Sequence, residues 1–423
     1  MGAIRLSLLE PSAIAHAAIS PWRAEKSVNA RRSATASESS QGTLHVLTIT
    51  PFYPTASDDA SGCFIAEPLQ VMTNLGVKNS VVVAAPAYRR SEPTYPNAPP
   101  ARRVRYLSLP GRWGLASAGA LLFPALLAHV RRLHKASPVD LIHAHAPLPC
   151  GHAALLLSRE LGIPYVVSVH GLDAYSTRQV SGRPGEWCRR VSRLVFQSAK
   201  RTLCISEHVR EQVLLGAATS RTGVVFNGVD PDRFSPSQRD LHDPPRVISV
   251  GNLIPIKGHT SLLRAIAAIA QTDSHLQCEI IGDGPEMSNL RILAEKLQLQ
   301  NRVRFLGRQS RQQVADRLRA ATLFALPSTY EGLGCVYLEA MACGKAVIGC
   351  RGQGIEEVIQ HAANGWLVGP DNVEELALSL RMLLHDSELR ARIGPQARTT
   401  ILQGFTLDHQ ARQLLRIYRE CVA

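Results

Sequence analysis

The clearest sign of the fold is the segment Leu323-Phe-Ala-Leu-Pro-Ser-Thr-Tyr-Glu331-Gly-Leu-Gly-Cys-Val-Tyr-Leu-Glu339-Ala-Met-Ala-Cys-Gly344. Its first four residues form a short apolar run, which is typical of a buried strand. Two glycines then open a helix and Gly344 closes it, so a helix follows the strand directly. The start of that helix exposes backbone N–H groups and a positive dipole end, which favour an anion such as phosphate.

Similar apolar runs alternate with helical patterns along the whole chain from Leu44 onward. Continuous apolar strands separated by helices are typical of parallel sheets covered on both faces, so the predicted fold class is α/β. The predicted strands are 44–50, 79–85, 104–109, 139–144, 165–170, 202–205, 224–227, 247–250, 278–281, 303–306, 323–326, 346–349 and 366–368, and the predicted helices include 262–270, 286–297, 311–320 and 373–384.

A polar, proline-rich stretch, Pro231–Pro245, divides this pattern in two. We therefore predict an N-terminal domain over 43–230, a linker over 231–245 and a second domain over 246–404. Two doubly wound domains would direct the carboxyl ends of their strands toward a shared cleft, where ligands bind. Residues 1–42 are predicted to be a flexible tail or to follow a start codon placed too far upstream, with a transit peptide as the alternative.

Composition limits the classes of protein. With 423 residues, 45% of them hydrophobic, the chain can bury large cores. The sequence contains no uninterrupted run of about 18 apolar residues, so no membrane-spanning helix is predicted. The net charge of +13 suits an anionic partner such as a phosphate-bearing substrate or an anionic membrane face. Aromatic residues make up only 5% without a basic–aromatic stripe, which argues against nucleic acid. Nine scattered cysteines without a CxxC pair predict buried thiols in a reducing compartment, here the cytoplasm.

Several residues in this pattern can carry chemistry. Glu339 follows Glu331 by about two helical turns, roughly 12 Å along the axis. Carboxylates beside a phosphate cradle suit a sugar and a ribose, although a capped core helix with Glu339 in a salt bridge explains the spacing equally well. The stretch from Val250 to Lys257-Gly258 ends a strand and leads into a helix, and a lysine at such a junction can reach a diphosphate. The turn Gly282-Asp283-Gly284 permits close backbone approach. A solvated lysine and a plain tight turn are the alternatives.

These motifs, taken in order, resemble family 4 of the retaining glycosyltransferases, which have the GT-B fold of two Rossmann-like domains. The similarity runs from Leu44 to the C-terminus and includes Asn227-Gly228-Val229-Asp230 and His170-Gly171-x-Asp173. The stretch Gly352-Gln-Gly354-Ile-Glu-Glu357, with Tyr53-Pro54 and Gly62-Cys-Phe-Ile, resembles the branch that builds extracellular polysaccharides, including the teichuronic-acid type enzymes.

The resemblance implies an enzyme that moves a sugar, a hexose, from a nucleotide-diphosphate sugar to a glycan or lipid-linked acceptor in cell-surface polysaccharide biosynthesis, without a metal or other cofactor. Glu331 would bind hydroxyls of the donor sugar, His170 would face that sugar across the cleft, and Lys257 would bind the diphosphate. The terminal segment 405–423 would cross back to the first domain. The implied donor-binding set is Glu339 at the ribose, the backbone of Gly332, Leu333 and Gly334 at the phosphates, Gly62 in a loop of the first domain, and Gly282, Gly284 and Asn252.

One position departs from the family. Asn252 stands where a basic residue is often found, so a cation that would neutralise the leaving diphosphate is missing there. Arg308 and Arg351 are the candidates to compensate. Two rival functions stay open at this point: a GT-B sugar-nucleotide epimerase, and a non-catalytic sugar-nucleotide-binding protein.

Three further features have an ordinary and a functional interpretation. His143-Ala-His145 could be half of a zinc site, but no third ligand is apparent nearby. Asp230-Pro-Asp232 imitates a metal-binding DxD motif, and its place beside the linker indicates coincidence. The segment Trp113–Lys135, with its basic end, is either an interfacial helix that brings the enzyme to the inner face of the cytoplasmic membrane or an ordinary helix of the first domain.

Overall fold

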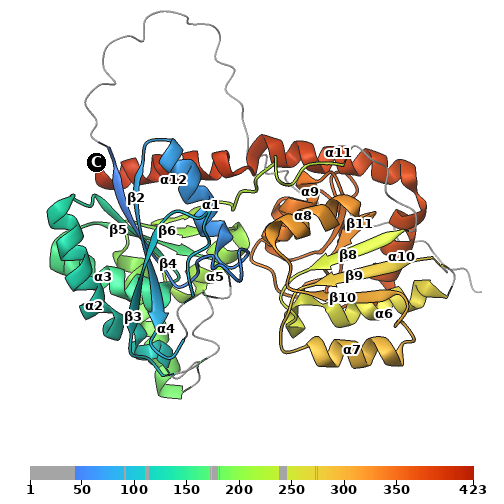
Figure 1. Cartoon of the computed structure of the whole chain (residues 1–423), viewed down its shortest axis with the longest axis horizontal. Helices are drawn as coiled ribbons and strands as arrows, with labels where there is room; N and C mark the ends of the chain where they lie inside the picture. The colour runs from blue at the N-terminus through green and yellow to red at the C-terminus, as the bar shows by residue number, and fades with distance from the viewer. Residues whose placement is uncertain are drawn as a thin grey trace, which may run out of the picture. The chain divides into compact units, whose positions relative to one another are not determined.

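The computed structural model describes residues 43–423 apart from 90–91, 110–113, 172, 174–179, 181, 238–244, 272 and 274. Residues Thr43–Ala423 form a single unit that contains two parallel sheets, each with helices on both faces (Figure 1). We call the first sheet with its helices the N-lobe (43–230 and 405–423) and the second the C-lobe (245–404). The tail predicted over 1–42 lies outside the described residues.

The N-lobe is built on seven parallel strands in the order β3-β2-β1-β4-β5-β6-β7. Successive side chains of a strand point to opposite faces, and here both faces are covered, so the central strands are largely apolar. In β1, Val46 packs on one face whereas Leu47 and Ile49 pack on the other. The strands are β1 (His45–Thr50), β2 (Lys78–Pro86), β3 (Ala101–Tyr106), β4 (Leu141–His145), β5 (Tyr165–Val169), β6 (Arg201–Cys204) and β7 (Thr222–Val224).

Helices α1 and α12 cover one face of this sheet, and α2, α3 and α4 cover the other. The apolar stripe of α2, Leu122, Leu126 and Val130, is fully buried in the core. The segment predicted over 113–135 is therefore an ordinary N-lobe helix rather than an interfacial one; its first residue lies outside the described residues. The N-lobe helices are α1 (Cys63–Asn74), α2 (Leu115–Ala136), η2 (Pro147–Gly151), α3 (His152–Leu161), α4 (Gly182–Ser198), α5 (Glu207–Gly216) and α12 (Leu407–Val422).

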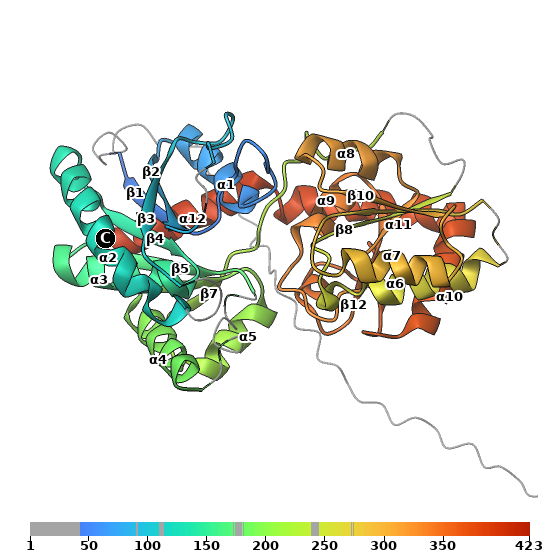
Figure 2. The same ribbon diagram turned by 60° about the horizontal axis from the view of Figure 1, so that its bottom comes forward.

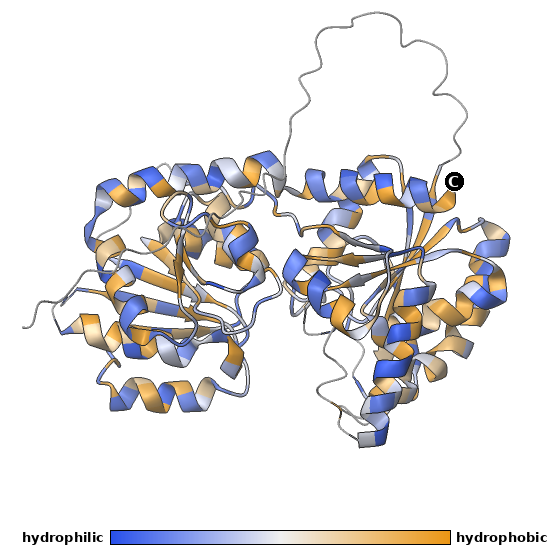
Figure 3. Cartoon of the chain, turned by 180° about the vertical axis from the view of Figure 1, so that it is seen from behind, coloured by the Kyte–Doolittle hydropathy of each residue, from blue (hydrophilic) through white to orange (hydrophobic). Residues whose placement is uncertain are grey.

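The C-lobe has six parallel strands in the order β10-β9-β8-β11-β12-β13. Helices α6, α7 and α10 pack on one face, and α8, α9 and α11 on the other; Figure 2 shows these layers from a second direction. The strands are largely apolar, whereas the helices combine apolar and polar residues (Figure 3). The elements are β8 (Arg246–Val250), η4 (Pro255–Lys257), α6 (His259–Ala270), β9 (Gln277–Ile281), α7 (Met287–Lys296), β10 (Val303–Gly307), α8 (Arg311–Ala320), β11 (Leu323–Ala325), α9 (Cys335–Ala342), β12 (Ala346–Cys350), η5 (Gly354–Glu357), β13 (Trp366–Val368), α10 (Val373–His385) and α11 (Ser387–Gly404).

The predicted α/β class with two doubly wound sheets is confirmed, and two strands lie elsewhere than predicted. The third strand occupies 101–106 instead of 104–109, because its register with β2 begins at Ala101. As an edge strand it carries exposed arginines that an apolar pattern does not detect. The strand predicted over 224–227 is only the short β7, because Thr222, Gly223 and Val224 are the residues that pair with β6.

Part of the predicted linker is packed against the C-lobe. Phe234 is fully buried, and the Arg398 guanidinium donates to its carbonyl at 3.2 Å. Residues 231–237 are therefore anchored, while 238–244 lie outside the described residues.

The last helix, α12, packs on the N-lobe although the helix before it, α11, packs on the C-lobe. Backbone bonds between Val229 and both Phe405 and Leu407 tie the chain down where it crosses back. Leu414 and Tyr418 are buried among the strands of the first sheet, and the Tyr418 hydroxyl lies 2.6 Å from Nδ1 of His143. The C-terminus therefore completes the core of the N-lobe.

This packing predicts that Leu414→Ala lowers the free energy of unfolding by about 2–5 kcal/mol, because the truncation leaves a cavity between α12 and the sheet. Arg416→Ala, on the exposed side of the same helix, should change it by less than about 0.5 kcal/mol. Urea denaturation of both variants measures the difference. Equal stabilities would show that α12 is only loosely attached.

Candidate active site

A cavity of about 440 Å³ lies between the lobes, at the carboxyl ends of β8, β9 and β11. This is the edge of a parallel sheet where ligands bind, since the strand-to-helix loops converge there. Its walls contain most of the residues selected from the sequence: His170, Asn252, Lys257, Gly282, Glu331, Gly332, Gly334 and Glu339.

Lys257 and Glu331 form an ion pair in this cavity. Lys257 ends the short helix η4, and its Nζ lies 2.5 Å from Oε2 of Glu331. The next residue, Gly258, has φ +69° and stands so close to the carbonyl of Pro327 that a Cβ would lie 1.9 Å from its oxygen, so only glycine fits there. An ammonium group has three N–H donors, so two remain for a ligand after the bond to Glu331. The site therefore presents a lysine whose charge is partly balanced by a carboxylate.

Glu339 also has a cation as its partner, and the sequence did not indicate which one. Arg311, the first residue of α8, donates from Nη1 to Oε1 of Glu339 at 2.5 Å. Both side chains are at least nine-tenths buried. The only signal for Arg311 was its place at the start of a predicted C-lobe helix that follows a strand.

The two arginines proposed to compensate for Asn252 lie in different places. Arg308 lines the cavity and pairs with Asp58 of the N-lobe. Arg351 instead pairs with Glu375 and donates to the carbonyl of Leu367, outside the cavity wall. Of the two, only Arg308 is placed to meet a ligand in the cavity.

The glycine loop before α9 contacts the N-lobe directly. Gly334 is left-handed at φ +80°, and a Cβ there would lie 2.6 Å from the ring of Tyr337. Ser206 of the N-lobe donates its hydroxyl to the carbonyl of Gly332 at 2.5 Å. Leu333, between them, is fully buried in the core, so its side chain does not line the cavity.

Gly62 and Gly284, which were also predicted to bind the donor, do not line the cavity; both stand where a side chain would collide with neighbouring backbone. A Cβ on Gly284 would lie 2.4 Å from the carbonyl oxygen of Leu253, so this glycine lets two C-lobe loops pack. A Cβ on Gly62 would lie 2.6 Å from the backbone of Phe52, and φ is +73° where α1 begins. The neighbours Asp58 and Cys63 line the cavity in its place.

His170 lies at the end of β5 and connects the cavity wall to a group of buried histidines. Its Nε2 is 2.9 Å from Nδ1 of His145, and the two rings are stacked. His143 is bonded instead to Ser168 and Tyr418. Burial lowers the pKa of His170 to about 4 and that of His143 to about 3, so both rings are neutral at pH 7.

The residues that resemble metal ligands in the sequence make ordinary structural contacts. His143 and His145 are engaged in the bonds just described, and the part of the chain that the structure describes contains no cluster of three potential metal ligands. Asp230 accepts from the backbone N–H groups of Asp232 and Arg233, so it caps a turn. The absence of a metal requirement stays a prediction. None of the described helices is both long and apolar enough to cross a bilayer.

Comparison with known proteins agrees with this geometry. A family model described as "Glycosyltransferase Family 4" matches residues 70–233, and one described as "Glycosyl transferases group 1" matches residues 231–400. The chain is 32% identical over 343 residues to a D-inositol 3-phosphate glycosyltransferase of Salinispora arenicola, covering 74% of this chain and 75% of that protein. It is 29% identical over 350 residues to the alpha-D-kanosaminyltransferase of Streptomyces kanamyceticus, covering 76% and 88%.

The fold also has solved counterparts. The structure of Anabaena Alr3699/HepE in complex with UDP-glucose matches with a TM-score of 0.71 and 21% identity, covering 89% of this chain and 100% of that one. The predicted GT-B fold is thereby confirmed, while the narrower likeness to the teichuronic-acid branch stays a prediction. The chain belongs to the family 4 type of glycosyltransferases with the GT-B fold, and it is a glycosyltransferase.

Proposed function

We propose that the chain is a retaining glycosyltransferase that transfers a hexose from a nucleotide-diphosphate sugar to a hydroxyl of a glycan or lipid-linked acceptor, in the assembly of a cell-surface polysaccharide. The observation that carries this proposal is the meeting of Lys257, Glu331 and Glu339 on the wall of one cavity. At about 440 Å³ the cavity is within the usual size of small-molecule sites.

Each residue has a role that follows from its chemistry. The departing diphosphate gains negative charge as the glycosidic bond breaks, and the main catalytic task is to stabilise that charge. The Lys257 ammonium and the N–H groups at the start of α9 would do so, with Arg308 as a further cation where Asn252 lacks one. Glu331 would accept from hydroxyls of the sugar and Glu339 from those of the ribose. His170, held neutral by burial, would face the sugar without adding charge. The acceptor hydroxyl would approach the donor sugar from the same face from which the diphosphate departs.

A ligand panel followed by product analysis tests the proposal. Uridine diphosphate is the first probe, because the similar Anabaena protein was solved with UDP-glucose. Binding raises the melting temperature by mass action, so the correct nucleoside diphosphate gives the largest shift in a panel. Proton NMR of the product then shows whether the anomeric configuration is retained. Conversion of the nucleotide sugar to its epimer, or binding without turnover, would instead support one of the two rival functions.

Lys257→Ala should weaken binding of the nucleoside diphosphate about 10- to 150-fold, because a hydrogen bond to a charged group is worth about 1.5–3 kcal/mol. Isothermal titration calorimetry measures the change. Lys296→Ala removes an exposed lysine of α7, outside the cavity wall, and should leave the affinity unaltered. Unchanged affinity in Lys257→Ala would remove this lysine from the site.

Catalysis should continue in EDTA at the rate seen without it. Lys257 and the start of α9 already supply positive charge where a divalent metal would otherwise neutralise the diphosphate. The measurement is turnover after dialysis against EDTA, with and without added magnesium or manganese. A strict requirement for either ion would contradict the metal-free mechanism.

We also propose that the enzyme is cytoplasmic and contacts an anionic membrane face peripherally, since the net charge is +13. Binding to vesicles that contain an anionic lipid should then fall as salt rises, because salt screens the attraction. Co-sedimentation at two salt concentrations measures this, with neutral vesicles as the control. Equal binding to both kinds of vesicle would contradict the electrostatic contact.

A further inference from the structure

The Arg311 guanidinium stands between two carboxylates that come from different lobes. Glu67, on α1 of the N-lobe, accepts from its Nε and its Nη2, both at 3.0 Å. Glu339, on α9 of the C-lobe, accepts from the remaining Nη1. The pair with Glu67 is bidentate, the strongest arrangement of arginine and carboxylate, whereas the contact with Glu339 uses one oxygen only.

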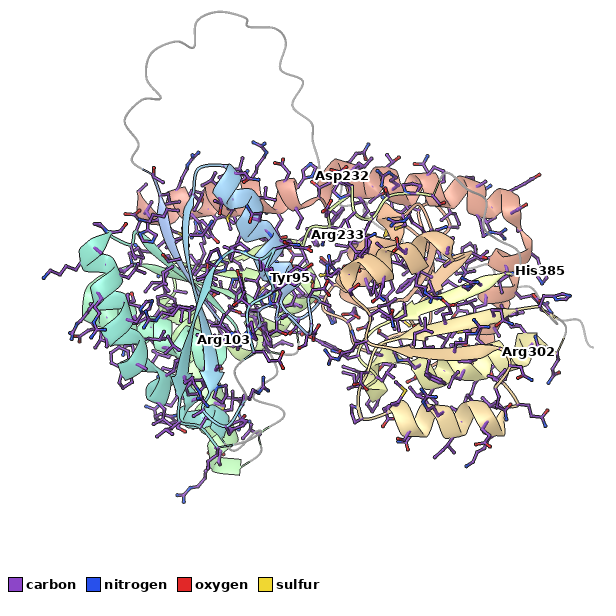
Figure 4. The ribbon with its side chains drawn as sticks, viewed as in Figure 1. Tyr95, Arg103, Asp232, Arg233, Arg302 and His385 are labelled. Carbon is purple, nitrogen blue, oxygen red and sulfur yellow. The ribbon has the colours of Figure 1, made fainter. Side chains whose placement is uncertain are left out.

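The surroundings of Arg311 restrict its orientation. The ring of Phe234 lies under the guanidinium, with 5.0 Å between its centroid and Cζ. Asp59 of the N-lobe accepts the backbone N–H of Arg311 at 3.1 Å. Arg233, which Figure 4 labels, pairs with Oε1 of Glu67 and holds that carboxylate in turn. The guanidinium is therefore held directly by Glu67 and Phe234, neither of which lines the donor cavity.

The two carboxylates stand in different cavities. Glu339 lines the cavity of the candidate active site, and its Oε2 accepts no hydrogen bond from any described residue. Glu67 lines a second cavity of about 390 Å³, and Arg311 belongs to the walls of both. Arg311 therefore connects Glu67 to the first cavity, although Glu67 itself does not line it.

We propose that Glu67 and Arg311 are positioning residues for recognition of the donor ribose: Glu67 occupies the fork of Arg311, so that Arg311 holds Glu339 by one oxygen and leaves the other for the ribose hydroxyls. The proposal rests on the function proposed above, in which Glu339 meets the ribose. Without Glu67, the guanidinium turns its fork to Glu339, because a bidentate pair is preferred. Both carboxylate oxygens of Glu339 are then occupied. Since Glu67 belongs to the N-lobe, the ribose site is complete only while α1 lies against α8.

The experiment measures the affinities for UDP and for 2′,3′-dideoxy-UDP by isothermal titration calorimetry, in the wild type and in Glu67→Gln, and compares the ratio of the two affinities. In the wild type the affinity for UDP should be at least about tenfold higher than that for the dideoxy compound, since the dideoxy compound loses hydrogen bonds to a charged group. In Glu67→Gln this ratio should fall to within about threefold of one, because Glu339 no longer offers a free oxygen. Arg311→Lys should lower the ratio as well, because one ammonium cannot bond Glu67 at two points and also hold Glu339 by one oxygen. This variant serves if Glu67→Gln does not fold.

Glu357→Gln is the matched control. Glu357 also joins the lobes, accepting from the backbone N–H groups of Glu207 and His208, but it contacts neither Arg311 nor Glu339. In Glu357→Gln the ratio of the two affinities should equal that of the wild type, even if the affinities for UDP and for the dideoxy compound both fall. A wild-type ratio that persists in Glu67→Gln and Arg311→Lys overturns the proposal while the ribose assignment of Glu339 stands. A wild-type ratio near one overturns that assignment, and the proposal with it.

Discussion

Parallel strands joined through helices all end at the same edge of their sheet, and this constraint decides where the chemistry of the chain lies. Each lobe therefore collects its loops at one edge, and the two edges face one cavity. The close approach of the loops depends on glycine: at Gly258 and Gly334 any Cβ would collide with a neighbouring loop or ring. The position of the cavity thus follows from the two sheets, and the close packing of the loops in its walls depends on these glycines.

Charge inside the cavity is balanced pair by pair. Glu331 is partnered by Lys257 and Glu339 by Arg311, so neither buried carboxylate is left without a cation. An unpaired buried charge would be costly, whereas a paired one can keep part of its hydrogen-bonding capacity for a ligand. The same pairs join separate elements of the C-lobe, η4 to the loop before α9 and α8 to α9, so the carboxylates are held in place before any substrate arrives.

Much of this arrangement could be predicted from the sequence, since it depends on local patterns. The apolar runs located the strands. The family resemblance of the motif that contains Glu331 and Glu339 indicated one wall of the cavity, which their spacing alone did not decide. Arg311 could not be found in this way, because its partner Glu67 is 244 positions away and nothing local distinguishes it from other arginines. The sequence also did not show that the side chain of Leu333 and the position of Gly284 lie away from the cavity wall, because proximity to a site in sequence does not show whether a residue faces the ligand or the core. The range predicted for β3 was wrong because β3 is an edge strand, in which exposed polar residues such as Arg102 and Arg105 interrupt the apolar pattern.

The position of α12 has a consequence for how the protein is made. Its side chains Leu414 and Tyr418 fill a face of the first sheet, yet the ribosome must translate the whole C-lobe before they emerge. At 5–20 residues per second, that face waits for roughly 10–40 seconds after β7 has left the ribosome. During synthesis the N-lobe therefore exposes the apolar surface that the last helix later covers, so chaperones have a defined interval and a defined surface on which to act.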